Sequence, residues 1–469
     1  MEHVNLNSVK KGTVFKGFSS SLSWFANVIG LSNDKESVDK LCDMLFNKNN
    51  PNGLHFNFVR YNIGGVEDPS LSKNFRIGGA MPAYVGKDWS TVDSGQRYFL
   101  KKAKELGVEN FEAFSNSPPN SMTISGSTAG SKPWKIPFMK QDKQNITFSN
   151  NLKSECIEDF AKYLVNVTKY LSEHDNINFS SISPINEPSG FGWVSTNNQE
   201  GCFYRYSIRK RLFKALRKEL DRQSIKDIKI SGPEENSMLF SFLSLILNPF
   251  NTKHIQQFNC HRYQWGSAIG INTYGFEDSN IFRKLIRWML KDKPIVMSEF
   301  GLGFLNGITD SKDFQNVLLL ADKIMADFNY LQPEAWVYWQ CFDSNGWGLC
   351  DVDFNDPSKV SIGALYKAMQ HFSHFIKPGH QLLELPKLKN KNLKWIGSQN
   401  ENEISLVILS KDLLDITLQL KQFISNTTIS ISNSKNFVCD NNLIKTKILE
   451  NINSLIIPSN SLVSVSFTI

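Results

Sequence analysis

The chain lacks the features that mark membrane-spanning, disulfide-rich and zinc-binding proteins. No apolar run reaches the ~18 residues of a membrane helix, so we expect no membrane partner. The seven cysteines are odd in number and none forms a C-x-x-C pair, which argues against a disulfide framework or a metal site. We expect free thiols, with Cys341 and Cys350 as the pair near enough in sequence to bridge a loop.

The N-terminal segment also lacks the apolar stretch of a signal peptide. Two locations stay open: the cytoplasm, which free thiols favour, or secretion after removal of a signal peptide. The net charge is only +7, and the densest basic run, residues 204–222, carries apolar residues at helical spacing. Because no nucleic-acid motif accompanies this run, we expect a solvated surface helix rather than a nucleic-acid partner.

Apolar residues make up 41% of the 469-residue chain, which is ample for a large core and, at this length, indicates two domains. Eight short β-rich runs alternate with helical patterns, as is typical of βαβ units and a parallel sheet. The runs lie at 14–19, 56–65, 108–118, 177–187, 227–235, 257–263, 294–301 and 335–340. Residues 268–275 are an alternative sixth run, but 257–263 gives more even spacing.

Helices are predicted between the runs and after the last one, over 35–46, 95–106, 152–174, 205–223, 236–247, 280–291, 311–328 and 362–375. From about residue 380, polar residues alternate with β-branched ones, which indicates a half-buried antiparallel sheet. The sequence therefore predicts an α/β fold. A (β/α)₈ TIM barrel spans 12–378, and a side-associated β-sandwich spans 379–469 and is joined by residues 1–11.

Two glutamates close predicted strands of the barrel. Glu187 ends the fourth run within Asn-Glu-Pro, and Glu299 ends the seventh. Their spacing corresponds to about three strand–helix units, so both side chains are expected at the barrel mouth, where active sites lie. Such a carboxylate pair cuts glycosidic bonds, because one carboxyl group protonates the leaving oxygen while the other faces the sugar ring. For Glu187, a surface or helix-start carboxylate is the alternative interpretation.

Neighbouring residues fit the same chemistry. Asn186 is placed to hydrogen-bond the sugar 2-hydroxyl. Arg60 on the second run and Tyr263 at the end of the sixth could keep Glu299 ionised, since a cation or a phenol donor lowers the pKa of a carboxyl group. A structural role beside a buried acid stays open for Arg60, and a packed core histidine stays open for His261.

Several phrases together resemble glycoside hydrolase family 30, within the clan A retaining hydrolases. They are FKGFSSSLSWFA, VRYNIGG, FEAFSNSPPNSMT, SPINEP, HRY, SEFG and HFSHFIKPG, and they run through the barrel into the β-domain. The resemblance implies a barrel with a side-associated β-sandwich. It implies that Glu187 is the acid/base, Glu299 the nucleophile and Arg60 the clan arginine near the nucleophile.

The resemblance also implies a sugar-binding set. His261 and Tyr263 match the sixth-strand His-x-Tyr (Tyr274 is the alternative tyrosine), Trp339 resembles the floor of the sugar subsite, and Asn116 begins the Asn-Ser-Pro-Pro phrase. The family often has an aromatic residue after Pro-Pro, where this chain has Asn120-Ser121. Aromatic stacking at that wall is therefore in doubt.

Within the family, residues 60–65 and 111–116 look most like the endo-β-1,6-galactanase branch. A galactose subsite could be lined by Glu112, Asp343, Trp24 and Trp347, although simple rim packing is open for each. We therefore predict a retaining glycoside hydrolase that acts on β-1,6-linked galactose chains, without metal or cofactor. The same mechanism on another sugar (β-1,6-glucanase, β-glucosidase, glucosylceramidase-like or xylanase) and a non-catalytic carbohydrate-binding barrel are the alternatives.

Overall fold

The structure is a computed structural model. It describes residues 2–4, 9–67, 89, 92–134, 146–247, 253–263, 274–303, 312–343, 347–420, 425–433, 447–449 and 454–468.

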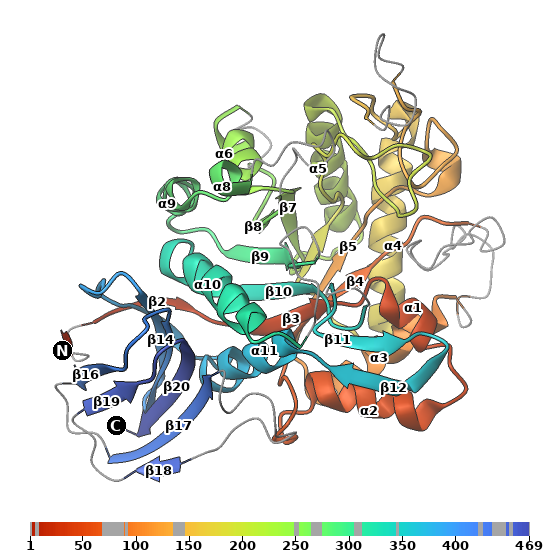
Figure 1. Cartoon of the computed structure of the whole chain (residues 1–469). Coiled ribbons are helices and arrows are strands. Elements are labelled where there is room, and N and C mark those ends of the chain that lie inside the picture. Colours follow the sequence, from red (N-terminus) through yellow and green to blue (C-terminus); the bar gives the residue numbers. More distant parts are fainter. Residues whose placement is uncertain are drawn as a thin grey trace.

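Eight parallel strands close into a barrel (Figure 1). They are β3 (Gly17–Ser21), β4 (Phe58–Asn62), β5 (Asn110–Phe114), β6 (Ser181–Ser183), β7 (Lys229–Glu235), β8 (Gln257–His261), β9 (Ile295–Phe300) and β10 (Ala335–Gln340). The strands follow one another in chain order, and β10 pairs with β3 to close the ring. The predicted TIM barrel is confirmed, with β8 in the sixth place. Residue 274 of the alternative run begins a short helix, and residues 268–273 lie outside the described residues.

Helices flank the barrel between its strands. The longer ones are α2 (Lys35–Phe46), α3 (Ser94–Glu105), α4 (Ile157–Asp175), α5 (Tyr206–Arg222), α6 (Met238–Leu247), α9 (Asn280–Met289), α10 (Gln315–Tyr330) and α11 (Ala364–Phe375). Short ones are α1 (Phe25–Ile29) and α8 (Tyr274–Glu277), with 3₁₀ turns at Asn120–Met122 and Ser154–Cys156. Among the described residues, no helix combines the length and the apolar character that a membrane crossing requires.

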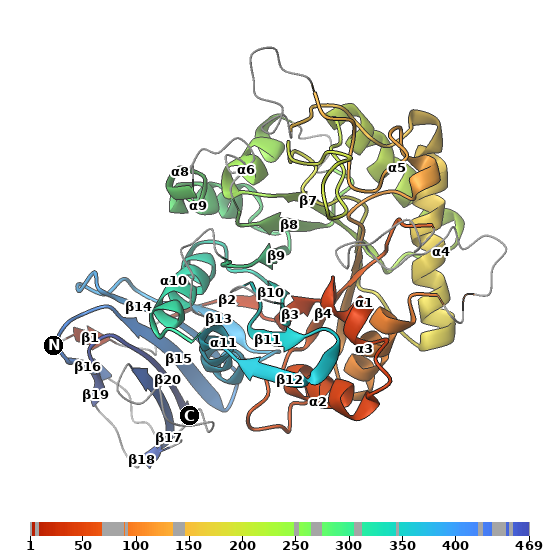
Figure 2. The same cartoon turned by 45° about the vertical axis from the view of Figure 1, so that its right-hand side comes forward.

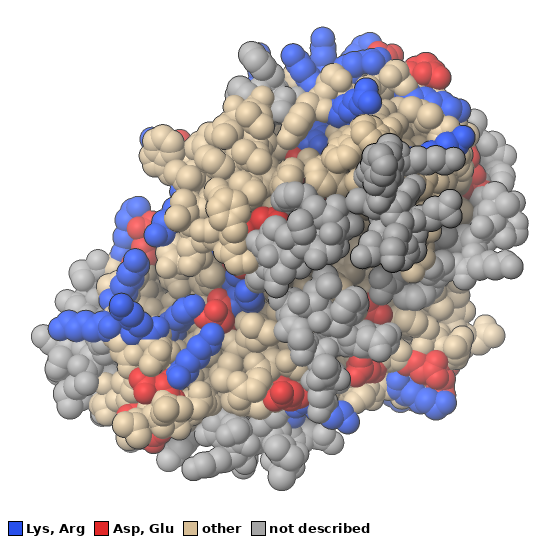
Figure 3. Space-filling view, turned by 45° about the horizontal axis from the view of Figure 1, so that its top comes forward, with Lys and Arg blue, Asp and Glu red and all other residues tan. Residues whose placement is uncertain are grey.

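The basic run forms α5 and packs as an amphipathic helix. Its buried face includes Ile208, Leu212, Leu216 and Leu220, which is the spacing that a helix on a barrel requires. Several of its charges pair within the helix, among them Arg222 with Glu219 at 2.6 Å. In the space-filling view, basic side chains gather toward the edges of the molecule with acidic ones among them, and the described surface between is mostly uncharged (Figure 3).

Two further sheets lie beside the barrel. One has seven strands in the order β18 (Lys447–Leu449), β17 (Ser425–Asn433), β20 (Ser461–Thr468), β15 (Glu403–Ser410), β14 (Leu393–Gln399), β13 (Gln381–Glu384) and β2 (Lys10–Val14). The other joins β1 (Glu2–Val4), β16 (Ile416–Leu420) and β19 (Ser454–Ile457). Leu455 and Ile457 of β19 share one apolar cluster with Leu406 and Val465 of the larger sheet, so the two sheets have a common core. The domain boundaries at 12 and 378 stay a prediction.

The seven-stranded sheet packs on the barrel through α10 and α11 (Figure 2). His371 of α11 is buried between the hydroxyls of Ser464, at 2.8 Å, and Ser432, at 2.7 Å. Burial lowers the pKa of His371 to about 3, so this contact is made by a neutral ring. A hairpin of β11 (Cys350–Asp353) and β12 (Asp356–Ile362) connects the barrel to α11. Cys341 and Cys350 are both free and buried, so the suggested bridge between them is absent.

Two glycines allow α1 to approach α3. A Cβ on Gly95 would lie 2.5 Å from the carbonyl oxygen of Asn27, and one on Gly30 would lie 2.0 Å from the carbonyl oxygen of Gly95. We therefore expect Gly95→Ala to lower the free energy of unfolding by about 1–3 kcal/mol, because an overpacked backbone contact outweighs the better helix propensity of alanine. Urea unfolding measures this change. Gly275→Ala, where an added Cβ meets nothing within 4 Å, is the matched control, and an equal loss in both variants would contradict the packing argument.

Candidate active site

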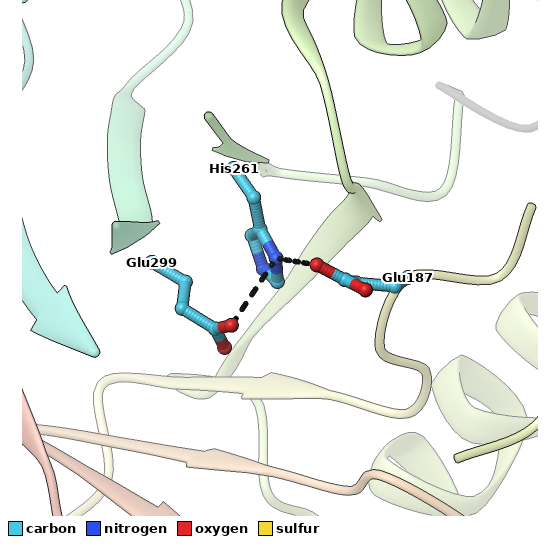
Figure 4. A group of neighbouring side chains, drawn as sticks. All are labelled: Glu187, His261 and Glu299. Carbon is cyan, nitrogen blue, oxygen red and sulfur yellow. Dashed lines mark hydrogen bonds and ion pairs between the residues drawn. The ribbon is translucent and has the colours of Figure 1, made fainter. Parts of the chain in front are cut away.

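Glu187, His261 and Glu299 converge at the carboxyl ends of β6, β8 and β9 (Figure 4). His261 Nδ1 lies 3.2 Å from Glu187 Oε1 and 3.7 Å from Glu299 Oε1. One side-chain atom from each residue lies within 4.8 Å of the corresponding atoms of the other two. The two carboxyl groups that the sequence singles out are therefore close enough to act on one bond.

The backbone at Glu187 is held in an unusual conformation. The sequence predicts that Glu187 ends a strand, but in the structure it follows the last residue of β6 by four residues. Its φ is 42°, which lies in the left-handed region that a residue with a Cβ seldom occupies. Its N–H donates to the carbonyl of Glu234 at 2.9 Å, and its carbonyl accepts from Gly190 N–H at 2.8 Å and from Trp193 Nε1 at 2.9 Å. Such over-determined strain is typical of functional positions.

Arg60 lies at the centre of a buried ionic network beneath the carboxyl pair. Its guanidinium donates to Glu112 Oε1, Glu234 Oε1 and the carbonyl of Ser298, each at 2.8 Å. Its Nη1 lies 3.7 Å from Glu299 Oε2. Each of its three nitrogens makes one of these short hydrogen bonds, so its planar fork is fixed in orientation. Arg60 thus presents a positive charge to Glu299 and also neutralises structural acids.

Glu234 orients His261 from below. Its Oε2 lies 2.7 Å from His261 Nε2 and accepts a hydrogen bond from Ser298 Oγ at 2.6 Å. Burial would raise the pKa of Glu234, but Arg60 and His261 lower it to about 2. Glu234 is therefore an ionised carboxylate that fixes the imidazole ring. The sequence reasoning missed Glu234, although it is the last residue but one of the predicted strand at 227–235 and so lies near a strand end, as Glu187 and Glu299 do.

Electrostatics favours a protonated His261 and raises the pKa of Glu299 above the ordinary range of a carboxyl group. Burial would lower the pKa of His261, but Glu299, Glu187 and Glu234 raise it to about 10. Burial raises the pKa of Glu299 to about 7; His261 and Arg60 oppose this rise and Glu187 adds to it. Because Glu187 raises this pKa only while it is ionised, a proton on Glu187 leaves the two cations to keep Glu299 charged.

Tyr263 and Asn186 complete the described centre. Tyr263 follows β8 by two residues, its ring centroid lies 6.2 Å from that of His261, and its N–H donates to the carbonyl of Asn236 at 2.6 Å. Burial and the carboxylates of Glu299 and Glu187 raise the pKa of its phenol, so it stays a neutral donor beside them. Asn186 is buried, and within the described residues its Oδ1 has no hydrogen-bond partner.

An aromatic wall stands on the β3 and β10 side of the mouth. Trp24 and Trp339 pack edge to face with centroids 6.1 Å apart. The Trp24 N–H donates to Gln340 Oε1 at 2.9 Å, and Gln340 Nε2 donates to Asp343. Trp347 lies over Gly303, where a Cβ would come within 2.4 Å of the indole. The structure thus groups these four predicted residues at one side of the site.

Two predicted sugar-binding residues lie deeper than expected. Glu112 is fully buried and accepts hydrogen bonds from Arg60, Ser181, Gln257 and Asn259. With both oxygens satisfied below the mouth, it supports Arg60 and does not fit a role in contacting sugar. Asn116 is also buried, and its Nδ2 donates to Asn62 Oδ1 at 3.1 Å.

Glu187, His261 and Glu299 have the ligand types of a metal site, but the imidazole does not fit that role. Both of its nitrogens already face carboxylates, at 3.2 and 2.7 Å, and those carboxylates favour the protonated ring, whereas a metal needs a neutral one. We therefore expect glycosidase activity to be unchanged after dialysis against EDTA. Inactivation that added divalent metal reverses would contradict this reading.

A TIM barrel with a close carboxyl pair at its mouth is the arrangement found in barrel glycoside hydrolases. The model of O-glycosyl hydrolase family 30 matches residues 2–261, more than half of the chain. The protein therefore belongs to O-glycosyl hydrolase family 30 and is a glycoside hydrolase.

The chain is also similar to individual proteins and solved structures. The chain is 28% identical over 409 residues to an endo-β-1,6-galactanase of Hypocrea rufa, a match that covers 82% of this chain and 77% of that protein. It is 20% identical to an exo-β-1,6-galactobiohydrolase of Bifidobacterium longum subsp. longum, over 79% of this chain and 32% of that protein. The catalytic domain of the family 30 xylanase C from Talaromyces cellulolyticus superposes with a TM-score of 0.71 at 15% identity, over 100% and 99% of the two chains, which shows the shared fold.

The pH dependence of activity tests the electrostatics of the site. If Glu299 must be ionised, kcat/KM rises with pH through the pKa of about 7 that burial produces. Removing the positive charge in His261→Gln should raise this pKa further, so the acidic limb should move to higher pH by about one unit. Exposed His174→Gln is the control and should leave the limb in place. An acidic limb that stays unchanged in His261→Gln would show that His261 does not tune the carboxyl pair.

Proposed function

We propose that the protein is a retaining glycosidase that cleaves β-1,6-linked galactose chains, with Glu299 as nucleophile and Glu187 as acid/base. The observation that carries the mechanism is the approach of the two carboxyl groups to within 4.8 Å. Retaining enzymes hold these groups about 5–5.5 Å apart, whereas inverting enzymes leave about 6.5–9.5 Å for a water molecule. The choice of galactose is supported by the likeness to the endo-β-1,6-galactanase of Hypocrea rufa.

The environment of each carboxyl group supports its role. Glu299 is 4% exposed and faces two cations, Arg60 and His261, each at 3.7 Å. Glu187 contacts one of these cations, His261, and its side chain is more exposed, at 14%. The group that faces two cations is suited to react as a charged nucleophile, and the group that is more open to solvent is suited to exchange a proton with the leaving oxygen and with water.

The reaction then proceeds in two displacements. Glu299 attacks the anomeric carbon while Glu187 gives its proton to the glycosidic oxygen, so the C–O bond breaks and a galactosyl-enzyme ester forms. Glu187, now ionised, takes a proton from water, and the resulting hydroxide attacks the same carbon and releases Glu299. Two inversions give net retention, and Glu187 regains its proton. Asn186 precedes Glu187, and none of the described residues hydrogen-bonds its amide oxygen, which supports a role in binding the sugar 2-hydroxyl.

Product analysis tests the sugar and the stereochemistry together. We expect β-1,6-galacto-oligosaccharides to be cleaved faster than matched gluco- and xylo-oligosaccharides, with the β-anomer appearing first in the NMR spectrum. First appearance of the α-anomer would overturn retention. Cleavage of only gluco- or xylo-chains would keep the two-glutamate mechanism and overturn the choice of galactose.

Substitutions separate the two glutamates. Glu299→Gln should lower kcat on the order of a thousandfold or more, because an amide cannot form the ester, whereas exposed Glu401→Gln should have no effect.

With β-galactosyl fluoride and azide, Glu299→Ala should yield the α-azide, formed by one displacement at the vacated face. Glu187→Ala should yield the β-azide from the galactosyl-enzyme. The opposite pairing of variants and products would reverse the assigned roles.

A further inference from the structure

Five aromatic side chains form a continuous surface beside the loop that carries Glu187. They are Trp134, Phe148, Phe191, Phe203 and Phe240, and we call them the aromatic shelf. Phe148 links the members, with ring centroids 5.0 Å from Trp134, 4.6 Å from Phe191 and 6.4 Å from Phe203. Phe240, on α6, extends the shelf from Phe191 at 6.4 Å. Sequence reasoning assigned no role to any of these residues.

The shelf is open to solvent where it could receive a ligand. Trp134 is 43% exposed and Phe148 is 36% exposed, and the other three rings are partly exposed. Rings that serve only as core are normally buried, whereas a contiguous apolar surface on loops at the active end of a barrel marks a binding site. The shelf draws its members from the segments that follow β5, β6 and β7.

The shelf is rigidly attached to the acid/base loop. Phe191 is four residues after Glu187, and its carbonyl accepts from Thr147 N–H at 2.8 Å. Trp193 donates its indole N–H to the carbonyl of Glu187 and accepts at its own carbonyl from Ser131 N–H. The indole packs on Gly201, where a Cβ would lie 2.1 Å from the ring. The loops of Phe148 and of Glu187 therefore form one unit.

The exposed end of the shelf is also pre-ordered. The Trp134 indole donates to Ser149 Oγ at 2.8 Å, and its backbone N–H donates to the carbonyl of Ile146 at 3.0 Å. A ring that is fixed before binding loses little conformational freedom when a ligand stacks on it. Such a platform suits a flat apolar ligand face better than a mobile side chain would.

We infer that the aromatic shelf binds the sugar units on the leaving-group side of the scissile bond. The inference rests on the proposed function of Glu187: the acid/base protonates the leaving oxygen, so whatever is bonded beyond that oxygen lies on the acid/base side. Sugar rings have faces of C–H groups, and galactose has a broad one because its axial hydroxyl points to the other face. Aromatic rings bury such apolar faces while the hydroxyls stay hydrated.

The inference predicts a dependence on the leaving group. β-Galactosyl fluoride has no sugar beyond the bond that breaks, whereas β-1,6-galactotetraose does. We expect Trp134→Ala and Phe148→Ala each to lower kcat/KM on the tetraose roughly tenfold, the scale expected when one stacking contact is lost. The same variants should remain within about twofold of the wild type on the fluoride, because the glutamates and their network are untouched.

Controls separate this role from general damage. Trp288→Ala removes a more exposed indole, at 74%, from α9 and should leave kcat/KM unchanged on both substrates. Phe148→Leu keeps an apolar core contact but removes the flat ring, so it should reproduce most of the loss even if Phe148→Ala folds poorly. Thermal unfolding of each variant shows whether the fold is intact.

The outcomes distinguish the shelf from the proposed function. If the wild type and the shelf variants have equal kcat/KM on the tetraose, or if a variant loses kcat/KM equally on both substrates, the inference that the shelf binds leaving-group sugars is overturned. If the wild type does not cleave the tetraose, the galactose assignment fails instead. The same comparison is then made with the oligosaccharide that the wild type does cleave and the matching glycosyl fluoride, and equal kinetics there would again overturn the shelf.

Discussion

The contact between Arg60 and its two glutamates is the interaction on which the site depends. Glu112, Glu234 and Glu299 lie on three different strands, β5, β7 and β9, yet all three carboxyl groups meet one guanidinium. An uncompensated charge in this fully buried position would be severely unfavourable. The barrel interior can therefore hold an ionised Glu299 only because a cation and its counter-charges are already in place beneath it.

The same arrangement explains why His261 is both structural and functional. Its Nε2 is held by Glu234, a fully buried acid, and its Nδ1 faces the carboxyl groups of Glu187 and Glu299. The interpretations left open by the sequence, a packed core histidine or a site residue, are thus not alternatives. A ring fixed on one side can act as a constant positive charge on the other.

The sequence could predict the barrel and the meeting of its strand ends, because hydrophobic periodicity locates strands and parallel strands share one active edge. It could not predict which way each polar side chain points. Glu112 was expected at the mouth and lies beneath it, and Glu234 was overlooked. Its direction follows from a left-handed backbone with φ 58°, which no periodic pattern encodes. The aromatic shelf could not be predicted for another reason: its members come from the segments that follow β5, β6 and β7, and these segments meet only in the folded chain.

Strands β2 and β3, near the start of the chain, pair with strands that lie hundreds of residues later in the sequence. β2 pairs with β13, in which Leu383 lies opposite Lys11, about 370 residues earlier in the chain. Only two residues separate β2 from β3, and β3 is the strand that β10 must meet to close the barrel. Both partners of this segment therefore emerge late from the ribosome. Contacts of such sequence separation form slowly, so we expect the closure of the barrel and the docking of β2 on β13 to be late steps of folding.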